Sequence, residues 1–127
     1  MWKVMIVDYE KLICKLVQAL VEWDKLGMQM AAQAENAIQA LDMLQQYRPD
    51  ILITDIRMPG MDGLELMSKV RDILPFTVFI ILTNYAEFSY AKQAISLGAR
   101  EYILKSEMRS SDIQRIVAEI AATTAKI

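Results

Sequence analysis

The chain alternates between two hydrophobic patterns. Short runs rich in β-branched and other apolar residues are typical of buried strands, whereas apolar residues spaced three or four apart are typical of amphipathic helices. Five runs of the first kind predict strands over residues 3–7, 28–34, 51–54, 76–82 and 101–104. A helical pattern follows each strand, and we expect these apolar residues to face the core: Leu12, Ile13, Leu16, Val17, Leu20, Ile38, Leu41, Leu44, Leu66, Met67, Val70, Ile73, Leu74, Ala91, Ala94, Ile95, Ile113, Ile116, Val117 and Ile120.

Residues that commonly begin or end helices mark the boundaries of these segments. Glycine often follows the last helical turn, so Gly27 and Gly98 predict the ends of the first and fourth helices. The pair Arg48-Pro49 predicts the end of the second helix, because the residue before a proline disfavours the α region. Polar capping patterns predict two helix starts, at Asn36 with Gln39 and at Ser111 with Gln114.

Five strand-then-helix units with short connections predict an α/β fold. The strands form one parallel sheet, and right-handed crossovers place helices on both of its faces, which makes the sheet doubly wound. The sequence contains no internal repeat and no linker, and its 127 residues are 54% hydrophobic. We therefore expect one domain with a single core over residues 1–127.

Composition excludes several classes of function. The net charge is −2 with no basic run, so the chain has no electrostatic footprint for nucleic acid. The absence of histidine excludes Ser-His-Asp and Cys-His catalysis, imidazole metal sites and a phosphohistidine donor. The longest apolar run, residues 76–82, is far shorter than the roughly 20 residues that a membrane helix needs, and no signal peptide is visible. The single cysteine, Cys14, suits a reducing cytoplasm, and its apolar neighbours predict a buried structural thiol.

Polar side chains follow four of the five predicted strands. Asp8 follows the first strand, Asp55 the third, Thr83 the fourth and Lys105 the fifth. The carboxyl ends of parallel strands meet at one edge of a sheet, where α/β proteins bind their ligands. Each residue alone has an ordinary explanation as a cap, a turn residue or a surface charge. Together, two acids, a hydroxyl and a lysine at equivalent positions indicate a functional site.

This set of residues suits phosphoryl transfer to a carboxylate. Asp55 would be the nucleophile that forms an aspartyl phosphate. A divalent ion such as Mg²⁺ would bridge the acids and the phosphoryl oxygens. Lys105 would offer a positive charge to the same oxygens, and Thr83 would offer a hydroxyl donor.

The sequence resembles the response-regulator receiver domains of two-component signalling over nearly its whole length. The matching motifs are IVDYE after the first strand, TDIRMPGMDG around the phosphoacceptor position, FIIL followed by threonine, and YILK. The resemblance implies that Asp55 is the phosphoacceptor. It also implies that Asp8 and the backbone carbonyl of Arg57 belong to the Mg²⁺ site, that Thr83 and Lys105 contact the phosphoryl group, and that Tyr102 changes rotamer with Thr83.

The same resemblance implies a fold and partners. The fold is a flavodoxin-like (βα)5 arrangement with strand order 2-1-3-4-5. The expected location is the cytoplasm, and the partners are a sensor histidine kinase and a C-terminal DNA-binding domain that these residues do not contain. The receiver domain is expected to contact neither membrane nor nucleic acid. Residues 82–105 are similar to receivers joined to AraC-type helix-turn-helix domains. The face formed by the fourth helix, fifth strand and fifth helix is the expected partner or homodimer surface.

Two departures from the family pattern bear on the metal. Tyr9 stands where the family usually has a second acid, and a neutral phenol is a poor Mg²⁺ ligand. Glu10 is near, but whether it acts as a ligand stays open at the level of sequence. Ser106 replaces a proline after the lysine, which predicts a looser loop around Lys105. We therefore expect weakened Mg²⁺ binding.

Three functional alternatives follow. The first is a phosphoacceptor receiver with weak metal binding, and the second is a pseudo-receiver that binds partners without phosphorylation. The third is a flavodoxin-like cofactor protein or a small phosphatase of the haloacid dehalogenase type. The residues disfavour the third class, because DYEKL is not a phosphate-binding loop and Arg57 stands where that phosphatase needs an acid.

Overall fold

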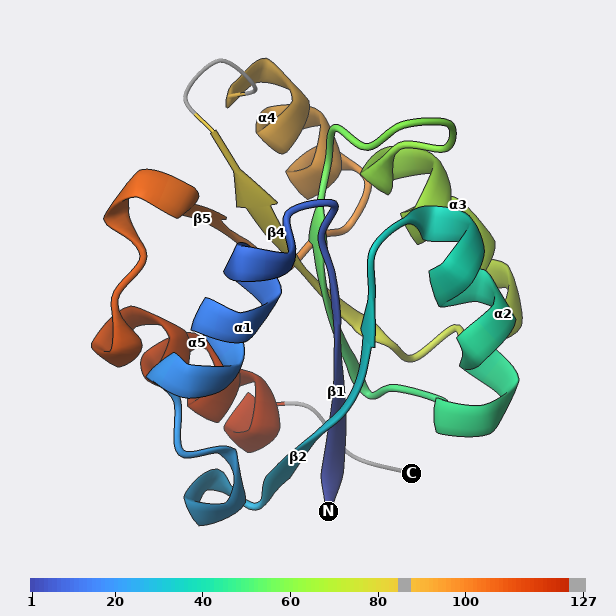
Figure 1. The fold of residues 1–127 in the computed structure, drawn as a ribbon. Coiled ribbons are helices and arrows are strands. Elements are labelled where there is room, and N and C mark those ends of the chain that lie inside the picture. Colours follow the sequence, from blue (N-terminus) through green and yellow to red (C-terminus); the bar gives the residue numbers. More distant parts are fainter. Residues whose placement is uncertain (85–87, 124–127) are drawn as a thin grey trace.

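A five-stranded parallel sheet forms the centre of the computed structural model, which describes residues 1–84 and 88–123 (Figure 1). The strands are β1 (Trp2–Val7), β2 (Met28–Ala34), β3 (Ile51–Asp55), β4 (Val78–Thr83) and β5 (Glu101–Leu104). Their order is β2-β1-β3-β4-β5, and every neighbouring pair is parallel. The sheet order that the family resemblance implies is confirmed.

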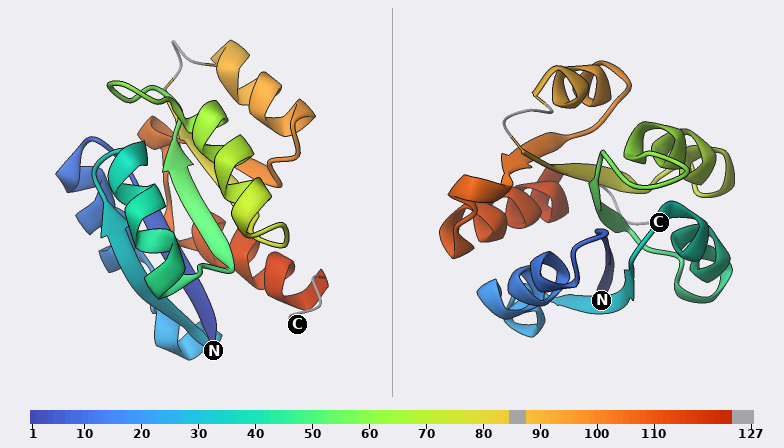
Figure 2. Two further views of the ribbon diagram at one scale, coloured as in Figure 1. Left: turned by 90° about the vertical axis from the view of Figure 1, so that its right-hand side faces the viewer. Right: turned by 45° about the horizontal axis from the view of Figure 1, so that its top comes forward.

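Helices cover both faces of this sheet (Figure 2). They are α1 (Lys11–Leu20), α2 (Ala37–Tyr47), α3 (Gly63–Ile73), α4 (Phe88–Ser96) and α5 (Ser110–Thr123), with short 3₁₀ turns η1 (Trp23–Leu26) and η3 (Lys105–Glu107). Helices α1 and α5 pack on one face, and α2, α3 and α4 pack on the other. The predicted doubly wound α/β fold is therefore confirmed.

The core consists of two apolar layers, one on each side of the sheet. Alternate strand residues enter opposite layers, as the period of two in a strand requires. In β1, Val4 and Ile6 pack against α1 and α5, whereas Met5 and Val7 face α2, α3 and α4. All five residues of β3 are buried, which fits its place at the centre of the sheet.

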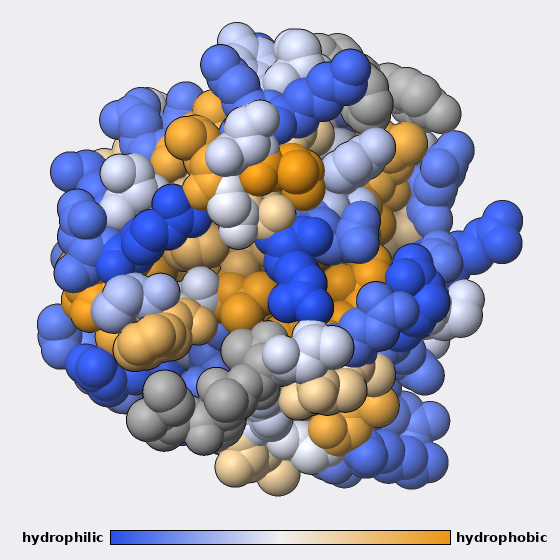
Figure 3. Space-filling model, turned by 180° about the vertical axis from the view of Figure 1, so that it is seen from behind, coloured by the Kyte–Doolittle hydropathy of each residue, from blue (hydrophilic) through white to orange (hydrophobic). Residues whose placement is uncertain are grey.

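Most residues of the predicted helical stripes are buried, but a few turn outward. Leu12 is 78% exposed and Ile38 is also exposed; α1 buries Val17, as predicted, together with Cys14. Small residues explain the shift in α2 and α4, because alanines there lie against the sheet and turn bulkier neighbours outward. The predicted core residues that are exposed are Leu12, Leu16, Ile38, Ile73 and Ile95. On the face drawn in Figure 3, apolar patches lie between hydrophilic residues.

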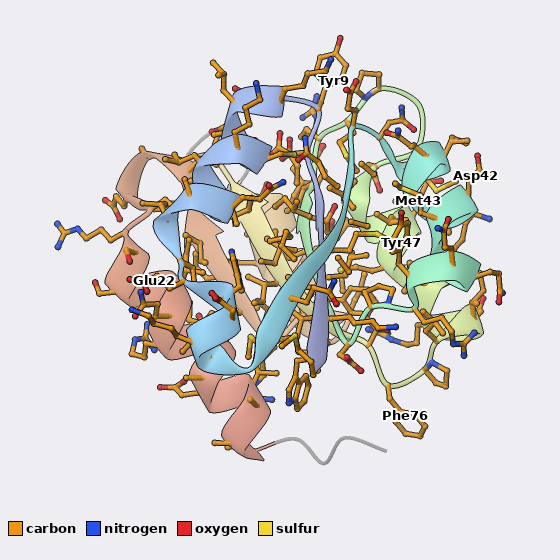
Figure 4. The ribbon with its side chains drawn as sticks, turned by 60° about the horizontal axis from the view of Figure 1, so that its bottom comes forward. Tyr9, Glu22, Asp42, Met43, Tyr47 and Phe76 are labelled. Atoms are coloured by element: carbon orange, nitrogen blue, oxygen red, sulfur yellow. The ribbon has the colours of Figure 1, made fainter. Side chains whose placement is uncertain are left out.

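Several predicted boundaries need correction. Helix α1 ends at Leu20, and Gly27, with φ of 72°, instead ends η1. Strand β4 begins at Val78, because Phe76 projects into solvent from the turn after α3 (Figure 4). Helix α5 begins at Ser110, so Ser111 lies inside the helix and is not its cap.

The other boundary signals act as predicted. Asn36 Oδ1 accepts a hydrogen bond of 2.8 Å from the backbone N–H of Gln39, which caps α2. Helix α2 ends at Tyr47, directly before Arg48. Helix α4 ends at Ser96, two residues before Gly98, whose φ of 108° is in the left-handed region. Residues 85–87 of the AraC-like segment and residues 124–127 lie outside the described part of the chain.

Candidate phosphoacceptor and metal site

Asp55 is the last residue of the central strand β3, and its side chain is almost fully buried. Its Oδ1 accepts a hydrogen bond of 2.8 Å from the backbone N–H of Ile56. Its Oδ2 faces the ammonium of Lys105 at 3.1 Å. The carboxylate therefore has one oxygen held by backbone and one oxygen held by a positive charge.

Lys105 brings a charge to the site from the edge of the sheet. It directly follows β5, two strands away from β3, which corresponds to roughly 10 Å of sheet. A long side chain can span much of this gap, and that of Lys105 is only 5% exposed. Its Nζ lies 3.0 Å from Asp8 Oδ2, 3.1 Å from Asp55 Oδ2 and 3.2 Å from Glu10 Oε1. One ammonium thus connects three carboxylates.

Asp8 is fully buried at the end of β1, beside β3. Its Oδ1 accepts a hydrogen bond of 2.8 Å from the backbone N–H of Glu10, while its Oδ2 lies 3.0 Å from Lys105 Nζ. Burial raises the pKa of the Asp8 carboxyl; the N–H of Glu10 works against this, and the Asp55 charge adds to it. Asp8 is therefore an acid that gains from a nearby cation.

The Lys105 ammonium is the counter-charge of this site. Burial alone would lower the pKa of Lys105, but its contact with Asp8 and the charge of Asp55 outweigh burial and raise it. Lys105 therefore stays charged at physiological pH, as the resemblance requires of a residue that contacts a phosphoryl group.

The loop after β3 passes close to Asp55 because Gly63 has no side chain. A Cβ at this position would lie 2.3 Å from the backbone oxygen of Asp55, and the Gly63 N–H donates a hydrogen bond of 2.7 Å to the Ile56 carbonyl. Arg57, whose backbone carbonyl is the expected metal ligand, lies within this loop. Its side chain is exposed, and its guanidinium lies 5.4 Å from the centre of the Tyr90 ring on α4.

Donor chemistry in this site suits Mg²⁺, which prefers oxygen ligands. Asp8 and Asp55 end adjacent strands, and both carboxylates contact the same ammonium at its Nζ. Among residues 1–84 and 88–123, no group of three acidic, cysteine or histidine side chains is arranged to hold a metal ion. Asp8 and Asp55 thus offer two buried carboxylates to a cation.

Thr83 and Tyr102 occupy the neighbouring strands. In the β3–β4 pairing Asp55 lies opposite Leu82, so Thr83 is one residue further along, and its buried hydroxyl donates to the Asn84 carbonyl oxygen at 3.1 Å. Tyr102 pairs with Ile81 and packs, half-buried, against the layer that contains α4. The structure thus places Thr83 beside the acids and Tyr102 on the next strand.

The peptide bond between Lys105 and Ser106 is trans, and residues 105–107 form the 3₁₀ turn η3. The Lys105 ammonium meets three carboxylates there, and the looser loop expected from Ser106 stays a prediction.

Comparison with known proteins identifies the family. The sequence model of the response regulator receiver domain matches residues 4–118. The chain belongs to this family. Receiver domains generally bind Mg²⁺ for phosphorylation, and their phosphorylated residue is an aspartate, with which Asp55 is consistent.

Similar receivers occur in transcriptional regulators. The chain is 37% identical over 123 residues to the uncharacterized transcriptional regulatory protein YesN of Bacillus subtilis, covering 94% of this chain and 33% of YesN. It is 34% identical over 105 residues to the transcriptional regulatory protein HptR of Staphylococcus aureus, covering 83% of this chain and 41% of HptR. The chain thus spans about a third to two-fifths of these relatives.

Solved structures agree with this placement. The receiver domain of AraT, a response regulator from Geobacillus stearothermophilus, superposes with a TM-score of 0.89 at 37% identity, covering 95% of this chain and 93% of that one. A two-component transcriptional regulator AraC from Clostridium phytofermentans gives 0.87 at 31% identity, covering 97% and 95%. The resemblance to receivers of AraC-type regulators is therefore confirmed. Within the described residues, none of the helices is long and apolar enough to span a membrane.

Two features of the site were outside the sequence-based expectations. Glu10 reaches the buried ammonium, although its position next to Tyr9 left its direction open. The contact between Arg57 and Tyr90 joins residues far apart in sequence.

Proposed function

We propose that this chain is the phosphoacceptor domain of a two-component response regulator, with Asp55 as the accepting residue. The observation that supports it best is the placement of the Asp55 carboxylate, buried at a strand end with Lys105 Nζ 3.1 Å from one oxygen. A carboxylate on a rigid central strand with a fixed counter-charge is suited to act as a nucleophile.

The proposed step transfers a phosphoryl group from a phosphohistidine of a sensor kinase. One Asp55 oxygen forms a bond to phosphorus while the bond from phosphorus to the imidazole nitrogen breaks, and the nitrogen keeps the electron pair and takes up a proton. Lys105 offers its charge to the phosphoryl oxygens, and the Thr83 hydroxyl offers a hydrogen bond. Asp8, Asp55 and the Arg57 carbonyl would hold Mg²⁺, which supplies charge neutralisation when bound.

The response would pass from Thr83 to Tyr102. A charged phosphoryl group is a stronger acceptor than the Asn84 carbonyl that the Thr83 hydroxyl now meets, so we expect the hydroxyl to turn toward it. Tyr102 is half-buried on the next strand, and its ring can bury further as space opens. The partner or homodimer surface would be the face of α4, β5 and α5.

The protein context is part of the same proposal. These residues would serve as the receiver domain, over 1–127, of a longer cytoplasmic regulator. It would control a DNA-binding output domain and have no catalytic turnover of its own. The names of YesN and HptR as transcriptional regulatory proteins support this, as does their greater length.

The test is intact mass spectrometry after incubation with a small phosphodonor and Mg²⁺. We expect the parent and Asp42→Asn, which changes an exposed aspartate on α2, to gain one phosphoryl group, and Asp55→Asn to gain none. An acid- and base-labile phosphate on Asp55→Asn would reject the assignment. A parent protein that stays unmodified would favour the pseudo-receiver, for which the substitution of an acid by Tyr9 is the supporting observation.

The relay has a separate test. Self-association and partner binding are compared for the parent, Thr83→Ala and Tyr102→Ala, with and without phosphodonor. We expect both substitutions to reduce the response to phosphodonor, and unchanged responses would reject the relay.

A further inference from the structure

Arg57 is the basic residue nearest to Asp55 in sequence, and its side chain lies against α4. It belongs to residues 56–62, which connect β3 to α3 and are called here the phosphoacceptor loop. Its exposed guanidinium lies 5.4 Å from the centre of the Tyr90 ring, within the range of a cation–π contact. None of the ion pairs among the described residues includes Arg57, so the structure pairs this guanidinium with the ring.

The Tyr90 ring is a fixed surface for this contact. Tyr90 lies in the first turn of α4 and packs, half-buried, against the core layer on that side of the sheet. Ala91 and Ala94 of the same helix are fully buried in this layer and hold α4 against the sheet. Arg57 is exposed, and exposed side chains change rotamer readily. The guanidinium can therefore leave the ring without any movement of the helix.

A phosphoryl group on Asp55 would offer this guanidinium a stronger partner. A phosphoryl group brings close to two negative charges, and a guanidinium binds its oxygens with two parallel charge-assisted hydrogen bonds. An exposed cation–π contact, by comparison, favours the bound form only about two- to fivefold. Arg57 follows Asp55 by two residues, which span at most roughly 7 Å, so its long side chain can reach the phosphoryl oxygens.

The Lys105 ammonium has little charge to spare for a phosphoryl group. Its single positive charge already faces the carboxylates of Asp8, Glu10 and Asp55. Phosphorylation adds negative charge at the same edge of the sheet, and this charge attracts further cations. Arg57 can respond to it by rotation of one exposed side chain.

We propose that the contact between Arg57 and Tyr90 is a latch between the phosphoacceptor loop and α4, and that phosphorylation opens it. In the unmodified protein, Tyr90 positions the guanidinium away from Asp55. When Asp55 carries a phosphoryl group, the guanidinium leaves the ring and binds the phosphoryl oxygens, and the first turn of α4 loses a contact. The inference rests on the proposed function. It adds a route to α4 that needs neither Thr83 nor Tyr102.

The test records the side-chain Nε–H signal of Arg57 by NMR, before and after incubation with acetyl phosphate and Mg²⁺. Intact mass spectrometry of the same samples reports whether a phosphoryl group is present. Tyr90→Leu removes the ring, Tyr90→Phe keeps the ring as the matched control, and Arg57→Gln assigns the signal by its loss.

A second arginine provides an internal control in the same spectrum. The Arg71 guanidinium lies 5.7 Å from the centre of the Phe79 ring. In the β3–β4 pairing Asp55 lies opposite Leu82, so Phe79 is three residues away along the strand, or roughly 10 Å. The Arg71 signal should therefore not respond to a phosphoryl group on Asp55.

We expect the ring to shift the Arg57 signal in the unmodified parent and in Tyr90→Phe, but not in Tyr90→Leu. Phosphorylation should abolish this ring shift in the parent and in Tyr90→Phe, and the signal should move to its position in phosphorylated Tyr90→Leu. In urea unfolding of the unmodified protein, a double-mutant cycle of Arg57→Gln and Tyr90→Leu should give a coupling of about two- to fivefold in the unfolding constant.

Two results would overturn the latch in the unmodified protein: a cycle without coupling, or an Arg57 signal that is the same in Tyr90→Leu as in the parent. A phosphorylated parent whose Arg57 signal keeps its ring shift, or whose Arg71 signal moves equally, would overturn the opening of the latch and leave the proposed function intact. Mass spectrometry identifies the other failure, because a parent that gains no phosphoryl group rejects the proposed function together with this inference.

Discussion

Replacing Lys105 by methionine should destabilise the protein strongly. Methionine retains a long apolar side chain but removes the ammonium that lies 3.0 Å from Asp8 and 3.1 Å from Asp55. At an effective dielectric constant of about 20, each such pair has a Coulomb energy of roughly 5 kcal/mol, and the cost of burying the ammonium offsets much of it. Glu10 adds little because water screens it. We expect a net loss of about 3–5 kcal/mol in the free energy of unfolding at pH 7.

The pH dependence of this loss has a definite sign. Burial raises the pKa of Asp8 in the folded protein. An acid with a raised pKa contributes stability that is fully present below its unfolded value and is lost as the pH rises through its folded value. Lys105 limits this loss by lowering the pKa of Asp8. The deficit of Lys105→Met should therefore be largest near neutral pH and shrink as the pH falls and Asp8 binds a proton.

Urea unfolding, followed by circular dichroism in the presence of a chelator, measures both effects. Lys11→Met is the matched control, because Lys11 forms an exposed pair with Glu35 at 3.2 Å and should cost no more than about 1 kcal/mol. A Lys105→Met variant as stable as Lys11→Met, or one whose deficit is the same at every pH, would refute the reasoning.

Three further predictions concern other parts of the chain. Gly63→Ala should cost more stability than Gly27→Ala in thermal unfolding. A Cβ at position 63 would lie 2.3 Å from the Asp55 backbone, whereas a Cβ at position 27 would meet nothing within 4 Å and only the positive φ would be strained. Equal losses of stability would contradict this. Burial, together with the Asp8 charge, raises the pKa of the Cys14 thiol to about 11. A thiol reagent at pH 8 should therefore label Cys14 only after the protein unfolds. Rapid labelling of the native protein would contradict the burial of this thiol. Asn36→Ala should lower the free energy of unfolding by about 1 kcal/mol through the lost cap of α2, and an unchanged urea midpoint would show that the cap contributes nothing.

The sheet and the buried site were predictable because strand patterns carry strong signals. An apolar run that ends in an acid has one low-energy placement, with the run in the core and the acid at its edge, and Asp55 follows this rule. Parallel strands then bring Asp8 and Lys105 to the same edge, whatever the details of the helices. The meeting of Asp8, Asp55 and Lys105 therefore followed from alternation and charge, whereas the roles of Arg57, Thr83 and Tyr102 rest on the family resemblance.

The helix faces were less predictable, because an amphipathic stripe is wide and packing selects a part of it. In α1 the choice between Leu16 and the adjacent Val17 depends on the neighbouring α5 and β1, which periodicity does not describe. The direction of Glu10 likewise depends on the hydrogen bond that its backbone N–H donates to the Asp8 side chain, which shapes the turn. Sequence spacing gives the residues of such a turn but not their orientation.

The stacking of Arg57 on Tyr90 gives the loop that carries an expected metal ligand a direct contact with α4. A molecule that binds α4 and changes this contact would be linked to the cation, and each would then change the affinity for the other by the same factor. A cation–π contact at an exposed site contributes about 0.5–1 kcal/mol, which limits the factor from this contact to about fivefold. A protein partner that covers α4 should then act, within that range, as a regulator of Mg²⁺ occupancy at a site it never touches.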